Sequence, residues 1–169
     1  MNFHFKAIRI LSLVLIALAA KGCGKGAGTA GSDEPTGMAA LLAGTWKTDC
    51  QDESGGGPTT SADYEITFPS HRTTGTYTYT ETRYGTADCS GAGTSDTSTG
   101  AFHIGIERSC GTDTCVNLDF DPGTENAEYT IFSIDEEASP PLLLMPDGGT
   151  TSGERPSALD DANEFVKQL

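Results

Sequence analysis

The chain has 169 residues and a formal net charge of −14 at pH 7, from 24 acidic and 10 basic side chains. This length suits one domain once targeting segments are set aside. The acidic excess argues against nucleic acid as a partner, because binding to phosphates requires clusters of lysine and arginine.

Residues 1–22 are typical of an export signal. Lys6 and Arg9 precede an apolar run from Ile10 to Ala20 that only Ser12 interrupts. The run is shorter than the roughly 20 apolar residues that span a bilayer, but it suits the apolar core of a signal peptide. Removal of residues 1–22 leaves 7 basic and 24 acidic side chains, a net charge of −17.

The segment that ends in Gly22-Cys23 resembles the processing site of bacterial lipoproteins, whose cysteine becomes the lipidated first residue. The resemblance implies that Cys23 carries a lipid anchor that binds the membrane. Because Gly24 is not aspartate, it also implies the outer membrane, on its periplasmic or cell-surface face. The alternative is ordinary secretion after cleavage near Ala20. Residues 24–37 are small and polar, which predicts a flexible tether of roughly 20 Å between Cys23 and the domain.

Four further cysteines follow, and an even number in an exported chain predicts two disulfides. Four cysteines allow three pairings. We favour Cys50–Cys89 and Cys110–Cys115. Zinc binding is the alternative, but the sequence has no Cys-x-x-Cys spacing and the expected compartment is oxidising.

Residues 38–169 form the predicted domain, and its dominant pattern is alternation of apolar and polar residues. Met38–Ala43 is a short apolar stretch that predicts a helical turn covering one end of the domain. Alternation at period two, rich in threonine and aromatic residues, predicts strands. These lie at residues 45–49, 63–68, 72–83, 102–106, 116–120, 129–134 and 142–145.

Residues 84–100 are rich in glycine, serine and threonine, which predicts a long loop around Cys89. A hairpin joins the strands on either side of Cys110–Cys115. We expect a bulge there, at Gly111, that places Ile106 opposite Leu118 and so keeps both apolar faces toward the core.

The C-terminal segment Ser157–Leu169 predicts an amphipathic helix. Ser157 and Asp160 have capping-box spacing after Pro156, and apolar residues recur at helical spacing. The chain therefore predicts an all-β domain of seven or eight antiparallel strands, a barrel or a sandwich, with one terminal helix.

Gly44-Thr45-Trp46, after a short helix-like segment, resembles the opening motif of the lipocalins. The segments Tyr84–Cys89 and Gly153–Asp160 are similar to small bacterial lipocalin-like lipoproteins. The resemblance implies an up-and-down, calycin-type β-barrel over residues 38–169. It also implies that Trp46 and Arg155 meet at the closed end. The family does not supply a ligand, since one barrel fold hosts many functions.

We expect no enzymatic activity, no cofactor and no metal site. The sequence contains no Gly-x-Ser-x-Gly nucleophile motif, and we expect His71 and His103 to lie on the surface. Asp119, Asp121 and Glu125 are oxygen donors, but they lack the calcium-loop pattern, and an acidic turn is the simpler interpretation.

Five aromatic residues are candidates to line a ligand cavity inside the barrel. The alternative is that they fill the core, since small eight-stranded barrels have little interior space. We therefore expect a non-enzymatic binding module for a small apolar ligand or a surface protein. The alternative is a structural or adhesion-type surface protein with a filled core. The candidate residues are Tyr64, Phe68, Tyr77, Tyr79 and Phe102.

Overall fold

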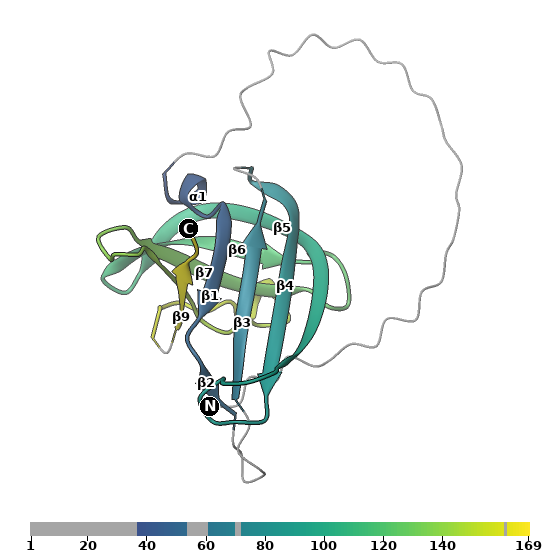
Figure 1. The fold of residues 1–169 in the computed structure, drawn as a ribbon. Helices are drawn as coiled ribbons and strands as arrows, with labels where there is room; N and C mark the ends of the chain where they lie inside the picture. Colours follow the sequence, from purple (N-terminus) through teal and green to yellow (C-terminus); the bar gives the residue numbers. More distant parts are fainter. Residues whose placement is uncertain (1–36, 54–60, 70–71, 161) are drawn as a thin grey trace. The chain divides into compact units, whose positions relative to one another are not determined.

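The computed structural model describes residues 37–53, 61–69, 72–160 and 162–169, and Figure 1 draws their ribbon. These residues lie in one compact unit, Asp33–Leu169. The expected export signal, Cys23, most of the tether and His71 fall outside the described residues. Within the described ranges, no helix combines the length and apolar character that crossing a membrane requires.

The domain consists almost entirely of strands, and all of the strands expected from alternation are present. The elements are α1 (Met38–Leu41), β1 (Gly44–Thr48), β2 (Gln51–Asp52), β3 (Ser61–Phe68), β4 (Thr74–Tyr84), β5 (Thr94–Cys110), β6 (Asp113–Phe120), β7 (Glu128–Asp135), β8 (Leu142–Met145), the 3₁₀ turn η1 (Ser152–Glu154) and β9 (Asn163–Lys167).

Eight antiparallel strands close into a barrel (Figure 1). From β3 to β9 each strand pairs with its neighbour in sequence, and β1 closes the ring by pairing with both β3 and β9. The short strand β2 is additional and pairs with the beginning of β3. The predicted all-β antiparallel barrel is confirmed.

Aromatic side chains from neighbouring strands form the centre of the core. Phe68 and Phe102 are 1% and 2% exposed, and their rings meet edge to face with centroids 5.2 Å apart. The Phe68 ring also stacks at 6.4 Å on Phe120, which in turn meets Tyr77 at 4.8 Å. Each such ring contributes about 2 kcal/mol or more by leaving water, so this cluster is a major source of stability.

The α1 end of the barrel is covered by apolar residues around Trp46. The indole is fully buried, and its Nε1 donates a hydrogen bond to the Leu42 carbonyl at 2.7 Å. The Lys167 ammonium lies 4.9 Å from the ring centroid and donates to the Leu41 carbonyl. Trp46 therefore stands beside a cation, and that cation is Lys167, which pairs with Trp46 in the β1–β9 register.

Arg155 lies elsewhere, on the outer face of β6 and β7. Its guanidinium donates to the carbonyls of Leu118 and Thr130 and pairs with Asp119. It also lies over the Tyr129 ring at 5.5 Å. The structure thus does not bring Trp46 and Arg155 together as predicted. Arg155 instead holds the segment between β8 and β9 against the outside of the barrel.

The C-terminal helix predicted at Ser157–Leu169 is wrong, because Asn163–Lys167 forms strand β9. This strand pairs with β8 on one side and β1 on the other, and Phe165 enters the core. A backbone ladder on both sides outweighs the helical spacing of a few apolar residues. Without β9 the ring would remain open, so the closure of the barrel decides the conformation of this segment.

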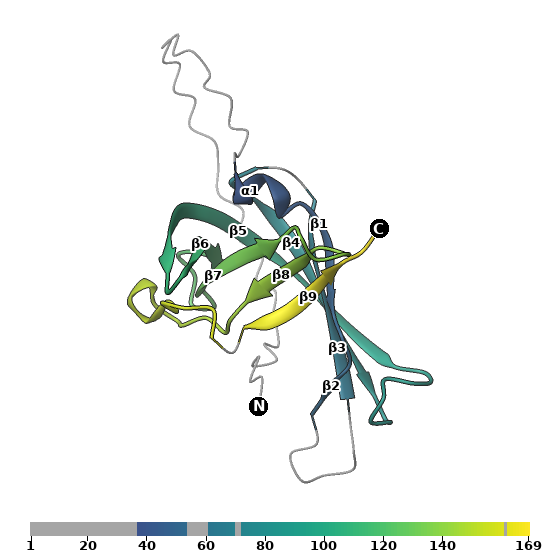
Figure 2. The same cartoon turned by 90° about the vertical axis from the view of Figure 1, so that its left-hand side faces the viewer.

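The loop predicted at residues 84–100 is also partly wrong, since β5 begins at Thr94. Its first half pairs with β4 from Arg83↔Thr94 to Thr76↔Ala101. The polar residues of this half show no apolar alternation because they do not reach the core. The ends of β3, β4 and β5 extend past the other strands (Figure 2).

The β5–β6 hairpin contains the expected irregularity at a different position. Gly111, with φ of +70°, opens a tight turn in which Cys110 faces Asp113. The register shifts between Ile104 and Glu107, so Ile104 faces Leu118 and Ile106 is 72% exposed. The bulge thus removes Ile106 from the core, whereas the predicted register buried it.

One of the two predicted disulfides is present. Cys50 and Cys89 are joined, whereas Cys110 and Cys115 are buried free thiols. Cys115 faces Arg108 and Cys110 faces Asp113, so the two cysteines are diagonal neighbours. Diagonal positions lie about 7–8 Å apart, beyond the usual Cα separation of a disulfide. Burial, followed by a hydrogen bond with Cys115, raises the pKa of Cys110 to about 12, so this thiol stays protonated.

Candidate functional site

The five candidate cavity residues all lie inside the barrel, but at different distances from the α1 end. Phe68 pairs with Gly44, near α1, and packs against Phe102 in the filled core. Tyr77 follows the Thr67↔Thr78 pair on β4, level with Phe68, and meets Phe120 and Asp121, whereas Tyr64 and Tyr79 lie on β3 and β4 toward the opposite end of the barrel. This end is the candidate site because its aromatic side chains are joined to polar groups.

The three tyrosines donate to, or lie close to, carboxylates from other elements. The Tyr64 hydroxyl donates to Glu53, which follows β2, and its ring stacks on Tyr79 with centroids 6.0 Å apart. The Tyr77 hydroxyl donates to Asp121 Oδ2 at 3.1 Å. Burial, more than the neighbouring carboxylates, raises the pKa of all three phenols. They therefore remain protonated hydrogen-bond donors at physiological pH.

Further charged groups lie on the same inner face. Glu81 follows Tyr79 on this face of β4 and faces Asp96 of β5 in register. Like charges directly opposite each other destabilise a sheet. Arg83 offsets this, since its Nε lies 2.6 Å from Glu81. We call the following set the tyrosine mouth: Tyr64, Tyr77, Tyr79, Glu53, Glu81, Asp96, Asp121 and Glu128.

Asp121 enters the mouth through a specific backbone arrangement in the loop after β6. It has a φ of +45°, and its Oδ1 accepts a 2.7 Å hydrogen bond from the Ala101 amide. A Cβ added to Gly100 would stand 2.5 Å from Asp121 Oδ1 and 2.6 Å from the Tyr77 ring. Gly100 thus lets Asp121 reach Tyr77. Sequence reasoning missed this role, since Gly100 fell in an expected loop.

The acidic residues considered for calcium are engaged separately. Asp119 pairs with Arg155 and with His103, whose Nδ1 lies 3.4 Å away, whereas Asp121 binds Tyr77 and Ala101. Within the part of the chain that the structure describes, no group of three or more His, Cys, Asp or Glu residues has an arrangement that could hold a metal. His103 lies on the outer face of the barrel, exposed.

Glu128 is a partly buried carboxylate of the mouth. It faces Phe120 across β6–β7, and its Oε1 accepts a hydrogen bond from the Gly148 amide at 3.1 Å. Burial raises its pKa, and the Gly148 hydrogen bond offsets part of this rise. A glutamate at this position is therefore costly when ionised.

The Glu128→Gln variant is expected to be more stable than the native chain at pH 7, by about 1 kcal/mol. Glutamine keeps an oxygen for Gly148 but carries no charge. Since the pKa of Glu128 is raised on folding, native stability falls as the pH rises from the ordinary glutamate pKa through the raised one. The gain should therefore vanish at low pH, as denaturant unfolding at pH 4 and pH 7 would measure. An equal gain in stability at pH 4 and pH 7 would show that the charge of Glu128 is not its cause.

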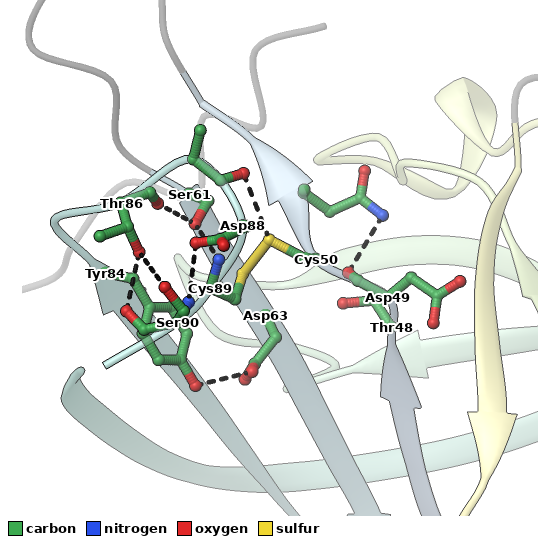
Figure 3. The surroundings of a disulfide bond; sticks show 12 residues. Thr48, Asp49, Cys50, Ser61, Asp63, Tyr84, Thr86, Asp88, Cys89 and Ser90 are labelled. Atoms are coloured by element: carbon green, nitrogen blue, oxygen red, sulfur yellow. Dashed lines mark hydrogen bonds between the residues drawn. A yellow bond between two sulfur atoms is a disulfide. The ribbon is translucent and has the colours of Figure 1, made fainter. Parts of the chain in front are cut away.

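The disulfide Cys50–Cys89 lies beside the far ends of β3 and β4 (Figure 3). Ser61 Oγ donates to the Thr86 carbonyl at 2.6 Å and accepts from the Cys89 amide at 3.0 Å. On the outer face, the Tyr84 hydroxyl donates to Asp63 at 2.9 Å (Figure 3). The disulfide and the two Ser61 hydrogen bonds hold the loop after β4 against the start of β3.

Glu53 and Asp121 accept hydrogen bonds from phenols, Asp121 and Glu128 accept from backbone amides, and Glu81 pairs with Arg83. The groups that define the mouth include no serine or cysteine nucleophile with an adjacent base. Comparison with protein-family models, with curated proteins and with solved structures found no match.

Proposed function

We propose that this domain is a non-enzymatic binding module that takes a small ligand with an apolar body and a positive charge at the tyrosine mouth. The observation that carries the proposal is the arrangement of Tyr64, Tyr77 and Tyr79. Their rings share one inner face, and carboxylates stand at the hydroxyls of Tyr64 and Tyr77.

Two physical arguments support a cationic ligand. Aromatic faces attract cations, and sites for quaternary ammonium groups are commonly built from several aromatic rings. The opposed carboxylates of Glu81 and Asp96 also carry more negative charge than the nearby Arg83 neutralises. A ligand cation placed between the rings and these carboxylates would relieve their repulsion.

We propose further that the protein works in the bacterial envelope, lipid-anchored through Cys23 at the outer membrane. The support is the apolar run before Cys23 and the small polar segment after it. On this proposal the tether holds the domain near the membrane, where small molecules outside the cytoplasm reach the mouth.

The second candidate function is a structural or adhesion-type surface protein. It is favoured by the mutual packing of Phe68, Phe102 and Phe120, which fills the barrel near α1. It is also favoured by the threonine-rich outer face, where Thr45 and Thr67 hydroxyls meet at 2.9 Å. The two candidates differ in whether removal of a mouth tyrosine abolishes binding.

The test is a calorimetric titration with three probes of similar size: benzyltrimethylammonium, benzyl alcohol and benzenesulfonate. We expect the cation to bind and the anion not to bind. The Tyr79→Leu variant should weaken binding of the cation at least about tenfold, by loss of one aromatic face. Tyr84→Leu is the matched control, since Tyr84 lies on the outer face of the same strand. Equal binding of all three probes, or equal loss in both variants, would refute the proposal.

A further inference from the structure

In the described part of the chain, the first half of β5 pairs with a neighbouring strand on one of its two sides and not on the other. Residues 94–101 pair with β4, whereas pairing with β6 begins at Phe102↔Phe120. Figure 2 shows β4 and β5, together with β3, continuing past the other strands. Within the described residues, the edge of residues 94–100 that faces away from β4 is therefore a free sheet edge.

The contacts of Ala101 show which backbone groups point away from β4. Its amide donates to Asp121 Oδ1 and its carbonyl accepts from the Asp121 amide, both at 2.7 Å. In an antiparallel ladder the bonded side alternates with each residue. The amide and carbonyl groups of Ser95, Thr97 and Thr99 therefore point the same way as those of Ala101, outward and without a strand to bind.

We propose that a second copy of this chain binds this edge, with the two β5 strands antiparallel and the two-fold axis at Thr97. Thr97 then faces Thr97 of the second copy, and Ser95 faces Thr99 of the second copy. Each of these residues presents an outward amide and carbonyl, so every pair forms two hydrogen bonds. Asp121 already occupies the position beside Ala101, which limits the added strand to the residues that are free.

The side chains fit the same register. On the outer face, Thr80 and Thr97 hydroxyls meet at 3.1 Å and Thr82 and Ser95 hydroxyls at 3.0 Å across β4–β5. Pairing of two β5 edges repeats this hydroxyl contact between Thr97 residues and between Ser95 and Thr99. Residues 94–100 contain no lysine, proline or bulge, which are common means by which an edge avoids pairing, and Asp96 is their one charged side chain.

Charge makes the association salt-dependent. Asp96 faces Ser98 of the second copy, so the two Asp96 carboxylates are diagonal rather than opposite. Each chain carries a net charge of −14, which opposes approach of a second copy. Because salt screens such repulsion, self-association should strengthen as the ionic strength rises. A basic partner on this edge would show the opposite dependence.

Analytical ultracentrifugation of the full chain tests the proposal. We expect the mean mass to rise with concentration from 17.6 kDa toward twice that value, more so at high salt. Thr97→Pro should weaken dimerisation at least about tenfold, because proline removes the outward amide without breaking the β4 ladder. Thr97→Val, which keeps the amide and loses only the hydroxyl, should weaken dimerisation much less than Thr97→Pro does. A native chain that stays monomeric at every concentration and salt level would overturn the proposal.

Disulfide trapping gives a readout that does not depend on the proline variant folding. Paired residues at the two-fold axis have Cα atoms about 5.5 Å apart, within reach of a disulfide. Thr97→Cys should form a covalent dimer under mild oxidation. Thr76→Cys, exposed on the same face of β4, is the matched control and should not. Equal trapping of both variants would show non-specific collision and refute the edge interface.

Discussion

Replacing Arg155 by methionine is expected to lower the free energy of unfolding by about 3–5 kcal/mol. The side chains of Arg155 and Asp119 are only 9% and 15% exposed, and they form one ion pair. Methionine fills similar volume but leaves the Asp119 carboxylate without its cation. It also leaves the Leu118 and Thr130 carbonyls without a donor. Guanidinium unfolding followed by Trp46 fluorescence measures the change.

Two further variants identify the cause of this loss. Arg72→Met removes an exposed arginine and should change stability by no more than about 0.5 kcal/mol. Asp119→Asn should cost less stability in the Arg155→Met background than in the native chain. In that background it removes the unpaired Asp119 carboxylate, whereas in the native chain it leaves Arg155 without its partner. A loss below about 1 kcal/mol for Arg155→Met would show that this contact does not hold the segment in place.

Removing the Cys50–Cys89 disulfide by alanine at both positions is expected to cost about 4 kcal/mol in the chain-entropy treatment. The bond closes a loop between residues 39 apart in sequence, so its loss frees the unfolded chain. Thermal unfolding with and without reductant measures the effect. In the native chain, reductant should lower stability by a similar amount.

The same experiment checks the state of the other cysteines. Because Cys110 and Cys115 are free thiols, reductant should not further destabilise the double alanine variant. Peptide mapping under non-reducing conditions should recover Cys50 linked to Cys89, and Cys110 and Cys115 unlinked. A reductant effect in the double variant, or a linked Cys110–Cys115 peptide, would contradict the structure.

The sequence predicts a strand where apolar and polar residues alternate because one face of the strand is buried and the other is in water. Tyr64, Ile66 and Phe68 alternate with polar residues because β3 has one face in the core and one in water. The first half of β5 escaped prediction because neither of its faces reaches the core. β9 escaped prediction because its conformation depends on pairing with β1, more than a hundred residues earlier in the chain.

Only the aromatic residues of the candidate site could be predicted from the sequence. The tyrosines follow from strand alternation, but the carboxylates that accept their hydroxyls come from elsewhere: Glu53 from the segment after β2 and Asp121 from the loop after β6. No local pattern joins these positions. The cation at Trp46 was misassigned for the same reason, since the β1–β9 register selects Lys167 over Arg155.

The central claim, that the tyrosine mouth holds a cationic small molecule, is tested most directly by native mass spectrometry. The protein would be purified gently from cells that export the full chain, together with its Tyr79→Leu and Tyr84→Leu variants. We expect an extra mass that leaves on denaturation, persists in Tyr84→Leu and is lost in Tyr79→Leu. A released compound without a positive charge, or the same occupancy in all three proteins, would contradict it.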